Sequence, residues 1–153
     1  MRRKDREITN PTVIAEIIRK AEVCHIGLCD EGEPYVLPVN FGYRDRIIYI
    51  HCAHEGRKLD IIRRNPRVCA VFDIDHELVR GEEAVKWSWK YRSVIAFGTA
   101  EILADDDLTG KTEALDILMS QYSDKSWTYP EKTLLRTGII RITIDRMTGK
   151  AHE

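Results

Sequence analysis

The sequence predicts a mainly β (α+β) fold in which six strands form an antiparallel barrel and helices pack at its periphery. Short runs rich in Val, Ile, Tyr and Phe are separated by turns of a few residues. Only three segments have helical periodicity, and they do not alternate with the strands as a parallel sheet would require. The sequence lacks G-x-G-x-x-G, Walker A, G-x-S-x-G and H-E-x-x-H, so it gives no support to the mechanisms that depend on those motifs.

Length and charge limit the classes of function. The 153 residues suit one domain spanning residues 1–153. With 24 basic and 25 acidic residues, the net charge is −1, so the charge balance gives no electrostatic indication of binding to nucleic acid or to an anionic membrane. No apolar run approaches the ~20 residues of a membrane helix, and the charged start does not resemble a signal peptide. We therefore expect a cytoplasmic protein.

The chain is expected to begin with a flexible arm, residues 1–9, followed by a helix. Asn10 can serve as the N-cap and Pro11 as the first helical residue. Apolar residues with helical spacing predict one packed face: Ile14, Ile17, Ile18 and Ala21.

A hairpin is predicted next. Residues 23–29 and 34–43 read as strands, joined by a turn at residues 30–32. Pro38 cannot donate a ladder hydrogen bond, so the second strand lies at a sheet edge or is bulged there. Backbone groups and the Asn40 side chain would then be free for a ligand, although a plain edge strand explains the same pattern.

The most informative stretch, residues 47–66, begins as a strand and ends as a helix, with Gly56 between them. Arg57 and Lys58 fall in the first helical turn, where the helix dipole disfavours cations by roughly 0.3–1 kcal/mol each. An anion held between these cations and the free N–H groups would explain them, so the pattern predicts a phosphate site. The alternative is two solvated basic residues beside Asp60.

Two further strands, residues 67–74 and 91–103, flank a long segment without periodicity, residues 75–90. A loop of this length in a compact domain is often functional. Trp87 and Trp89 could cap a pocket or become buried at a subunit interface, and the interface is slightly favoured.

The remaining elements are a helix and a final strand. In the strand of residues 91–103, Gly98 marks a bulge or bend. Acidic residues 105–107 precede a helix, residues 123–130 form a loop, and residues 137–144 form the last strand. The predicted apolar face of this helix consists of Leu115, Leu118, Met119 and Tyr122.

A metal site is not expected. The four cysteines lie in apolar runs without C-x-x-C spacing, which predicts buried free thiols: Cys24, Cys29, Cys52 and Cys69. His25, His51 and His54 could add zinc ligands, but none of the usual spacings occurs.

The order of these segments resembles a known family. The stretches His-Cys-Ala-His-Glu-Gly-Arg-Lys, Asn-Pro-Arg-Val and Tyr-Arg-Ser-Val-Ile-Ala-Phe-Gly follow one another as in the FMN-binding split barrel of the pyridoxamine 5'-phosphate oxidase superfamily. Within it, the chain is most similar to the nitroimidazole-resistance (Nim) proteins. The resemblance covers nearly the whole chain and implies a six-stranded antiparallel split barrel.

The resemblance also implies a homodimer with FMN at two interface sites. Arg57 and Lys58 match the pair that binds the FMN phosphate, and Ser93, beside Arg92, is the nearest match to a polar cofactor contact. The residues that match the flavin-lining strands are Leu37, Pro38, Val39, Asn40, His51, Cys52 and Ala53.

The function implied is an FMN-dependent oxidoreductase acting on a small molecule. His51, or else His54, could donate a proton to the substrate, although a packed flavin wall is the favoured role for His51. The C-terminal Trp and Arg motif of the oxidases that make pyridoxal phosphate does not occur, so that activity is not expected. The alternatives are a flavin-binding module without turnover and a haem protein with an axial ligand from His25, His51 or His54.

Overall fold

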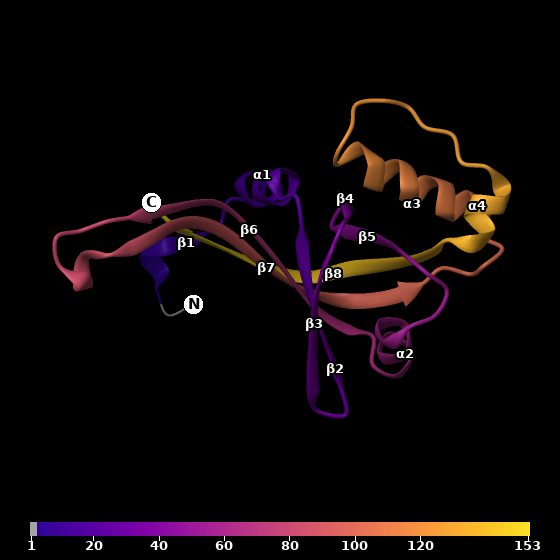
Figure 1. Ribbon diagram of the computed structural model, residues 1–153, viewed down its shortest axis with the longest axis horizontal. Helices are drawn as coiled ribbons and strands as arrows, with labels where there is room; N and C mark the ends of the chain where they lie inside the picture. Colours follow the sequence, from indigo (N-terminus) through magenta and orange to yellow (C-terminus); the bar gives the residue numbers. More distant parts are fainter. Residues whose placement is uncertain (1–2) are drawn as a thin grey trace.

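The strands join in one antiparallel sheet that remains open between its two edges (Figure 1). The computed structural model describes residues 3–153. The sheet order is β3-β2-β6-β7-β8-β5-β4, and β1 pairs with β8 off this path. The strands are β1 (Glu7–Ile8), β2 (Cys24–Asp30), β3 (Glu33–Val39), β4 (Gly42–Arg44), β5 (Ile47–Cys52), β6 (Arg67–Val79), β7 (Ser88–Ile102) and β8 (Gly138–His152).

Four α-helices surround this sheet. They are α1 (Pro11–Lys20), α2 (Arg57–Arg64), α3 (Leu108–Ser120) and α4 (Glu131–Arg136), and short 3₁₀ turns form η1 (Lys4–Arg6) and η2 (Ala84–Lys86). The mainly antiparallel fold is thus confirmed, as an open sheet of the split-barrel kind.

The strand count differs from the predicted six for two reasons. The predicted strand 34–43 ends at Val39 and resumes as β4, because Asn40 and Phe41 leave the ladder. In addition, β1 pairs with Gly149 and Lys150 of β8, where the sequence had suggested a loose arm. Residues 1 and 2 of that predicted arm lie outside the described residues.

The inner face of the sheet carries the main core. Inward residues of β2, β6, β7 and β8 pack with α1 and α2 in one apolar cluster, and alternate residues point to the outer face. The prediction for α1 is confirmed, since the Asn10 side chain accepts a hydrogen bond from the Thr12 N–H at 2.9 Å. Its predicted apolar face is buried: Ile14, Ile17, Ile18 and Ala21.

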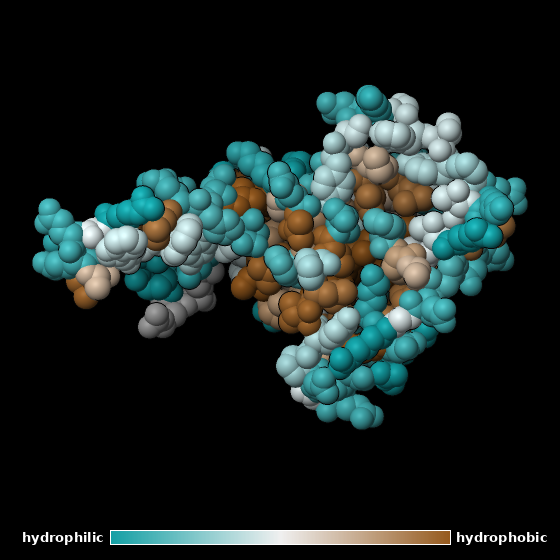
Figure 2. Space-filling model, viewed as in Figure 1, coloured by the Kyte–Doolittle hydropathy of each residue, from teal (hydrophilic) through white to brown (hydrophobic). Residues whose placement is uncertain are grey.

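Half of the predicted long loop at residues 75–90 is strand. β6 continues to Val79 and β7 begins at Ser88, so the two strands form a hairpin arm that projects from the body (Figure 1). In Figure 2 the arm is mostly hydrophilic, whereas hydrophobic residues gather in the middle of the face in view. The arm extends beyond the core, so its sequence has no alternation of apolar residues to reveal it. Trp87 and Trp89 lie at its end, 48% and 53% exposed.

Helix α3 packs through a face that the sequence did not fully identify. Leu118 is buried as predicted, but Tyr122 is exposed. The other buried positions are Lys111, Ala114 and Ile117. The Lys111 ammonium donates to the backbone carbonyls of Asp105 at 2.8 Å and of Leu134 at 3.1 Å. A lysine therefore joins α3 to the unpredicted helix α4, and periodicity of apolar residues cannot show this.

The predicted irregularity at Gly98 is confirmed, because the β7–β8 register shifts between Phe97 and Gly98. A Cβ atom at Gly98 would lie 2.3 Å from the Thr143 carbonyl oxygen. Only glycine therefore allows β8 to approach this closely.

We expect Gly98→Ala to lower the free energy of unfolding by about 1–3 kcal/mol, because the backbone of β8 must move. Gly27→Ala is the matched control, since a Cβ there would meet its nearest atom at 3.5 Å. Urea unfolding of both variants measures the difference. Equal stabilities would show that the close approach at Gly98 does not constrain the sheet.

Candidate functional site

The candidate site lies where the open sheet brings strand β3 near the end of β5 and the start of α2. β3 is the edge strand of the sheet, as Pro38 predicted. Leu37 and Val39 of β3 and Cys52 of β5 pack against the same core cluster. Four residues separate the end of β5 from the start of α2, and Arg57 in the first turn of α2 contacts Glu33 and Tyr35 of β3.

The backbone N–H groups at the N-terminus of α2 have no capping side chain as a partner in the described residues. Gly56 occupies the N-cap with φ of 131°, a value that favours glycine, and no side chain caps this end within the described residues. A Cβ at Gly56 would meet no atom within 4 Å. This helix end therefore faces open space with its positive dipole end.

Arg57 and Lys58 occupy this first turn, as the sequence predicted, but their surroundings differ. The Arg57 guanidinium donates to Glu33 at 2.7 Å and lies 4.7 Å from the centre of the Tyr35 ring. Lys58 is half-buried, and none of the ion pairs within residues 3–153 involves it. Lys58 is thus the cation available to an outside anion, and Arg57 is partly neutralised by a carboxylate of its own chain.

The end of β5 divides the predicted residues between two faces. Cys52 faces the core, and burial raises the pKa of its thiol despite the opposing charges of Lys58 and Arg63. His51 is exposed and lies opposite Ile139 on β8, on the other face of β5. A ligand on the core side would meet the Cys52 side chain and only the backbone of His51. Ala53 is exposed just after the strand.

The predicted flavin-lining residues of β3 are divided in the same way. Leu37 and Val39 are half-buried on the inner face, whereas Pro38 is exposed on the outer face, opposite His25. Asn40 is exposed directly after the strand ends.

Ser93 lies apart from the other predicted residues. It is on the outer face of β7, paired with Asp73 of β6 and Lys150 of β8. Two strands, β6 and β2, separate β7 from β3 in the sheet. One copy of the chain therefore does not bring Ser93 beside Arg57 and Lys58.

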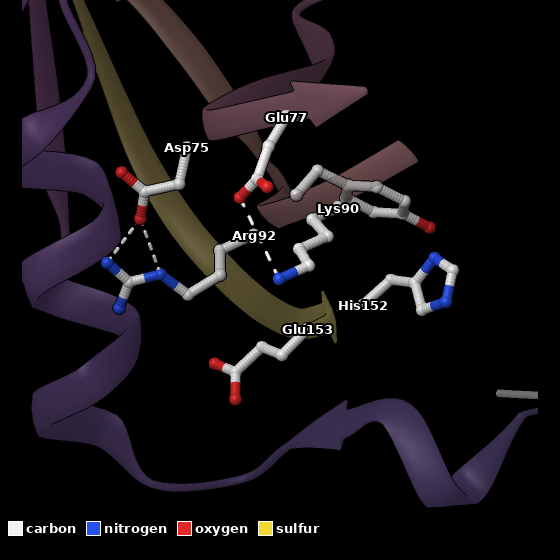
Figure 3. A pocket seen from close by; sticks show the side chains of 7 residues that line it. Asp75, Glu77, Lys90, Arg92, His152 and Glu153 are labelled. Carbon is white, nitrogen blue, oxygen red and sulfur yellow. Dashed lines mark hydrogen bonds and ion pairs between the residues drawn. The ribbon is translucent and has the colours of Figure 1, made fainter. Parts of the chain in front are cut away.

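Arg92, the neighbour of Ser93, points to the opposite side of the sheet, into a charged pocket of about 320 Å³ (Figure 3). There it bonds to Asp75 and lies 3.9 Å from Glu16 of α1. The Lys90 ammonium is 3.7 Å from Glu77 in the same pocket. Because each of these cations has a carboxylate partner, the pocket offers no surplus positive charge to a phosphate.

The histidines do not form a metal site in the part of the chain that the structure describes. No group of three or more His, Cys, Asp and Glu residues is placed to hold a metal ion there. His54 is engaged within the chain, since its Nδ1 lies 2.8 Å from the Asp105 carboxylate.

Glu33 and Tyr35 were missed as parts of the site. They share the inner face of β3 with Leu37, and alternation along the strand would have placed them there. Their contacts with Arg57 join residues 24 and 22 positions apart, which no local pattern reveals.

The open sheet with its edge strand β3 defines the class of open, split antiparallel barrels. The sequence profile of the pyridoxamine 5'-phosphate oxidase family matches residues 11–151, and the chain belongs to that family. A search of curated proteins found no match.

Solved structures support the same assignment. A candidate 5-nitroimidazole antibiotic resistance protein from Bacteroides thetaiotaomicron is 33% identical, with a TM-score of 0.84 over 96% of this chain and 90% of that one. The FAD and haem binding protein of Mycobacterium smegmatis is 21% identical, with a TM-score of 0.86 over 97% and 74%. The flavocytochrome Anf3 of Azotobacter vinelandii is 20% identical, with a TM-score of 0.85 over 100% and 72%. The last two show likeness of fold alone. No helix in the described residues is long and apolar enough to cross a membrane.

The floor of the candidate site can be tested through Cys24, which lies opposite Val39 on β2. Burial raises the pKa of the Cys24 thiol to about 12. At pH 8 only about one such thiol in ten thousand is ionised, compared with roughly a quarter for an ordinary thiol. We therefore expect Cys24 to be the last of the four cysteines alkylated by iodoacetamide, with peptide mass spectrometry as the readout. Labelling of Cys24 as fast in buffer as in urea would contradict this closed floor.

Proposed function

We propose that the protein binds FMN and acts as a flavin-dependent oxidoreductase on a small molecule. The observation that carries the proposal is the uncapped N-terminus of α2, with the unpaired Lys58, near the half-buried apolar side chains of β3 and β5. Backbone N–H groups, a helix dipole and a cation together suit a phosphate. Leu37, Val39 and Cys52 offer an apolar wall that suits a flat ring.

Different residues of this chain would hold the phosphate and the ring of FMN. Arg57, Lys58 and the N–H groups of the first turn would hold the phosphate, and inward residues of β3 and β5 would orient the ring and exclude water from one side. Bound FMN would supply two-electron transfer, and the protein would set its position and electrostatics. His51 is the proposed proton donor, with His54 as the second candidate. The exposed side chain of His51 leaves β5 on the face opposite Cys52, so it would serve a substrate that reaches that face.

A homodimer would complete this site. The outer face of the sheet carries an apolar patch formed by β3, β6 and β7, with Gly27 of β2 between Val36 and Cys69. The residues of this outer apolar patch are Val36, Cys69, Val71, Ile95 and Phe97. Val36 is 65% and Ile95 is 40% exposed in one copy. A groove of about 330 Å³ lies on this patch. We propose that a second copy covers this patch and brings its own Ser93 towards the start of α2.

The substrate would be a small molecule that accepts or donates two electrons, and the 33% identity to a candidate 5-nitroimidazole resistance protein makes a nitro-aromatic the first compound to try. Trp87 and Trp89 are exposed enough to wall such a pocket or to contact a second copy. A flavin carrier without turnover is the alternative, and steady-state reduction of a nitro-aromatic or quinone separates the two. Four free cysteines suit a reducing compartment, so we also propose the cytoplasm.

The cofactor assignment is tested with Arg57→Ala combined with Lys58→Ala. Loss of two charge-assisted contacts, at roughly 1.5–3 kcal/mol each, should weaken FMN at least a hundredfold. The matched control combines Arg63→Ala with Arg64→Ala, which removes the same charge from the last turn of the same helix.

Equilibrium dialysis and the visible spectrum measure bound FMN. We expect the control to keep its FMN and both variants to unfold cooperatively. Unchanged FMN affinity in the first variant would refute the phosphate site, and a Soret band in the purified protein would favour the haem alternative.

The dimer is tested by placing charge on the outer apolar patch. Val36→Glu combined with Ile95→Glu would bury two carboxylates at the proposed interface, so we expect a monomer by size exclusion with light scattering. Val85→Glu is the control, because Val85 is 87% exposed on the arm. A dimer that survives the double change would rule out this face as the interface.

A further inference from the structure

We propose that Lys150 is a cofactor-contact residue that each copy contributes to its partner's flavin site, where its charge favours the reduced flavin. The inference rests on the proposed function. It starts from the register of the outer face, which sets Asp73, Ser93 and Lys150 side by side on β6, β7 and β8.

This polar row borders the outer apolar patch. Val71 and Ile95 lie two residues from Asp73 and Ser93 along their strands, on the same face. A second copy seated on the patch would therefore place the polar row at the rim of the interface. Polar groups that converge at the rim of an apolar interface are typical of small-molecule sites.

The Lys150 side chain turns towards β7. Its ammonium lies 5.4 Å from the centre of the Tyr91 ring, and Tyr91 shares the outer face with Ser93. Glu7 of β1 lies on its other side, directly opposite in the register, but the two do not approach within 4 Å as an ion pair in the described structure. Asp73 is held by His76 at 2.9 Å. Lys150 is thus half-buried beside a hydroxyl and an aromatic ring, with its charge available.

An aromatic ring, a hydroxyl and an ammonium group suit a flat ring that accepts hydrogen bonds and gains negative charge. Reduction of a flavin by two electrons and one proton leaves one negative charge on its ring, so a nearby cation stabilises the reduced form. Lys58 and Lys150 would then have separate roles. Lys58 of one copy holds the phosphate, and Lys150 of the other copy favours the electron-rich ring.

The test compares the midpoint potential of the FMN-loaded wild type with that of Lys150→Met. We expect reduced FMN to lose about tenfold more affinity than oxidised FMN, which corresponds to a potential about 30 mV lower for a two-electron couple. Lys90→Met is the matched control. It removes the same charge from the neighbouring strand but from the opposite side of the sheet, where Lys90 faces Glu77. Lys150→Arg should restore most of the wild-type potential, because it keeps the charge.

The possible outcomes are distinct. A Lys150→Met protein that binds FMN as a dimer with the wild-type potential would overturn the inference and leave the proposed function standing. Equal shifts in Lys150→Met and Lys90→Met would also overturn it, since they would show a general effect of net charge. Wild-type protein that takes up no FMN would overturn the proposed function, and this inference with it. If Lys150→Met is not a dimer by light scattering, Lys150→Gln takes its place with the same expectation.

Discussion

The sheet has two apolar faces, and the helices of its own chain cover them unequally. Helix α3 packs on the outer face at Tyr49 of β5 and Ile139 of β8. On the inner face, α1 and α2 bury a continuous core that includes Ile17, Ile61 and Phe72. On the outer face, Val36 and Ile95 remain exposed. Removal of apolar surface from water is worth about 25 cal/mol per Å², so burial of this face would favour association of two copies. The proposed dimer follows from that constraint.

The same open sheet explains where the candidate site lies. A closed barrel would pair β3 with another strand, whereas here β3 ends the sheet. Its prolines at positions 34 and 38 cannot donate to an added strand, which protects the edge from further pairing. The edge therefore stays available to a ligand, and the start of α2 supplies positive charge next to it. Glu33 reduces that positive charge through its ion pair with Arg57, so Lys58 is the side chain that mainly attracts an anion.

Sequence reasoning located the features that depend on local chemistry. The Asn10 cap, the edge strand at Pro38, the Gly56 turn with two cations and the bulge at Gly98 each follow from one residue's backbone or charge, and the structure contains all of them. The arm was missed because strands that leave the core need no apolar alternation. The α3 face was misjudged because a buried lysine, Lys111, packs where an apolar residue was expected.

Pairings between strands that are distant in the sequence could not be predicted, for a different reason. Nothing near Ser93 in the sequence indicates that Lys150 lies beside it, because β7 and β8 are joined by two helices and their register is fixed by the whole sheet. Likewise, alternation indicates that His51 and Cys52 face opposite ways, but only the fold shows that Cys52 is the one that packs with Leu37 and Val39 against the core. The family resemblance named candidate site residues, and their roles remain proposals.

The central claim is that two copies share each flavin site, and a mixed dimer tests it most directly. One partner would carry Arg57→Ala with Lys58→Ala, and the other Ser93→Glu with Lys150→Glu, each pair chosen to abolish FMN binding in its own homodimer. If the site is shared, the mixed dimer contains one intact site, and we expect FMN to be restored to about one per dimer. If each site lies within a single chain, both halves of the mixed dimer remain defective. A mixed dimer that binds no FMN would contradict the account.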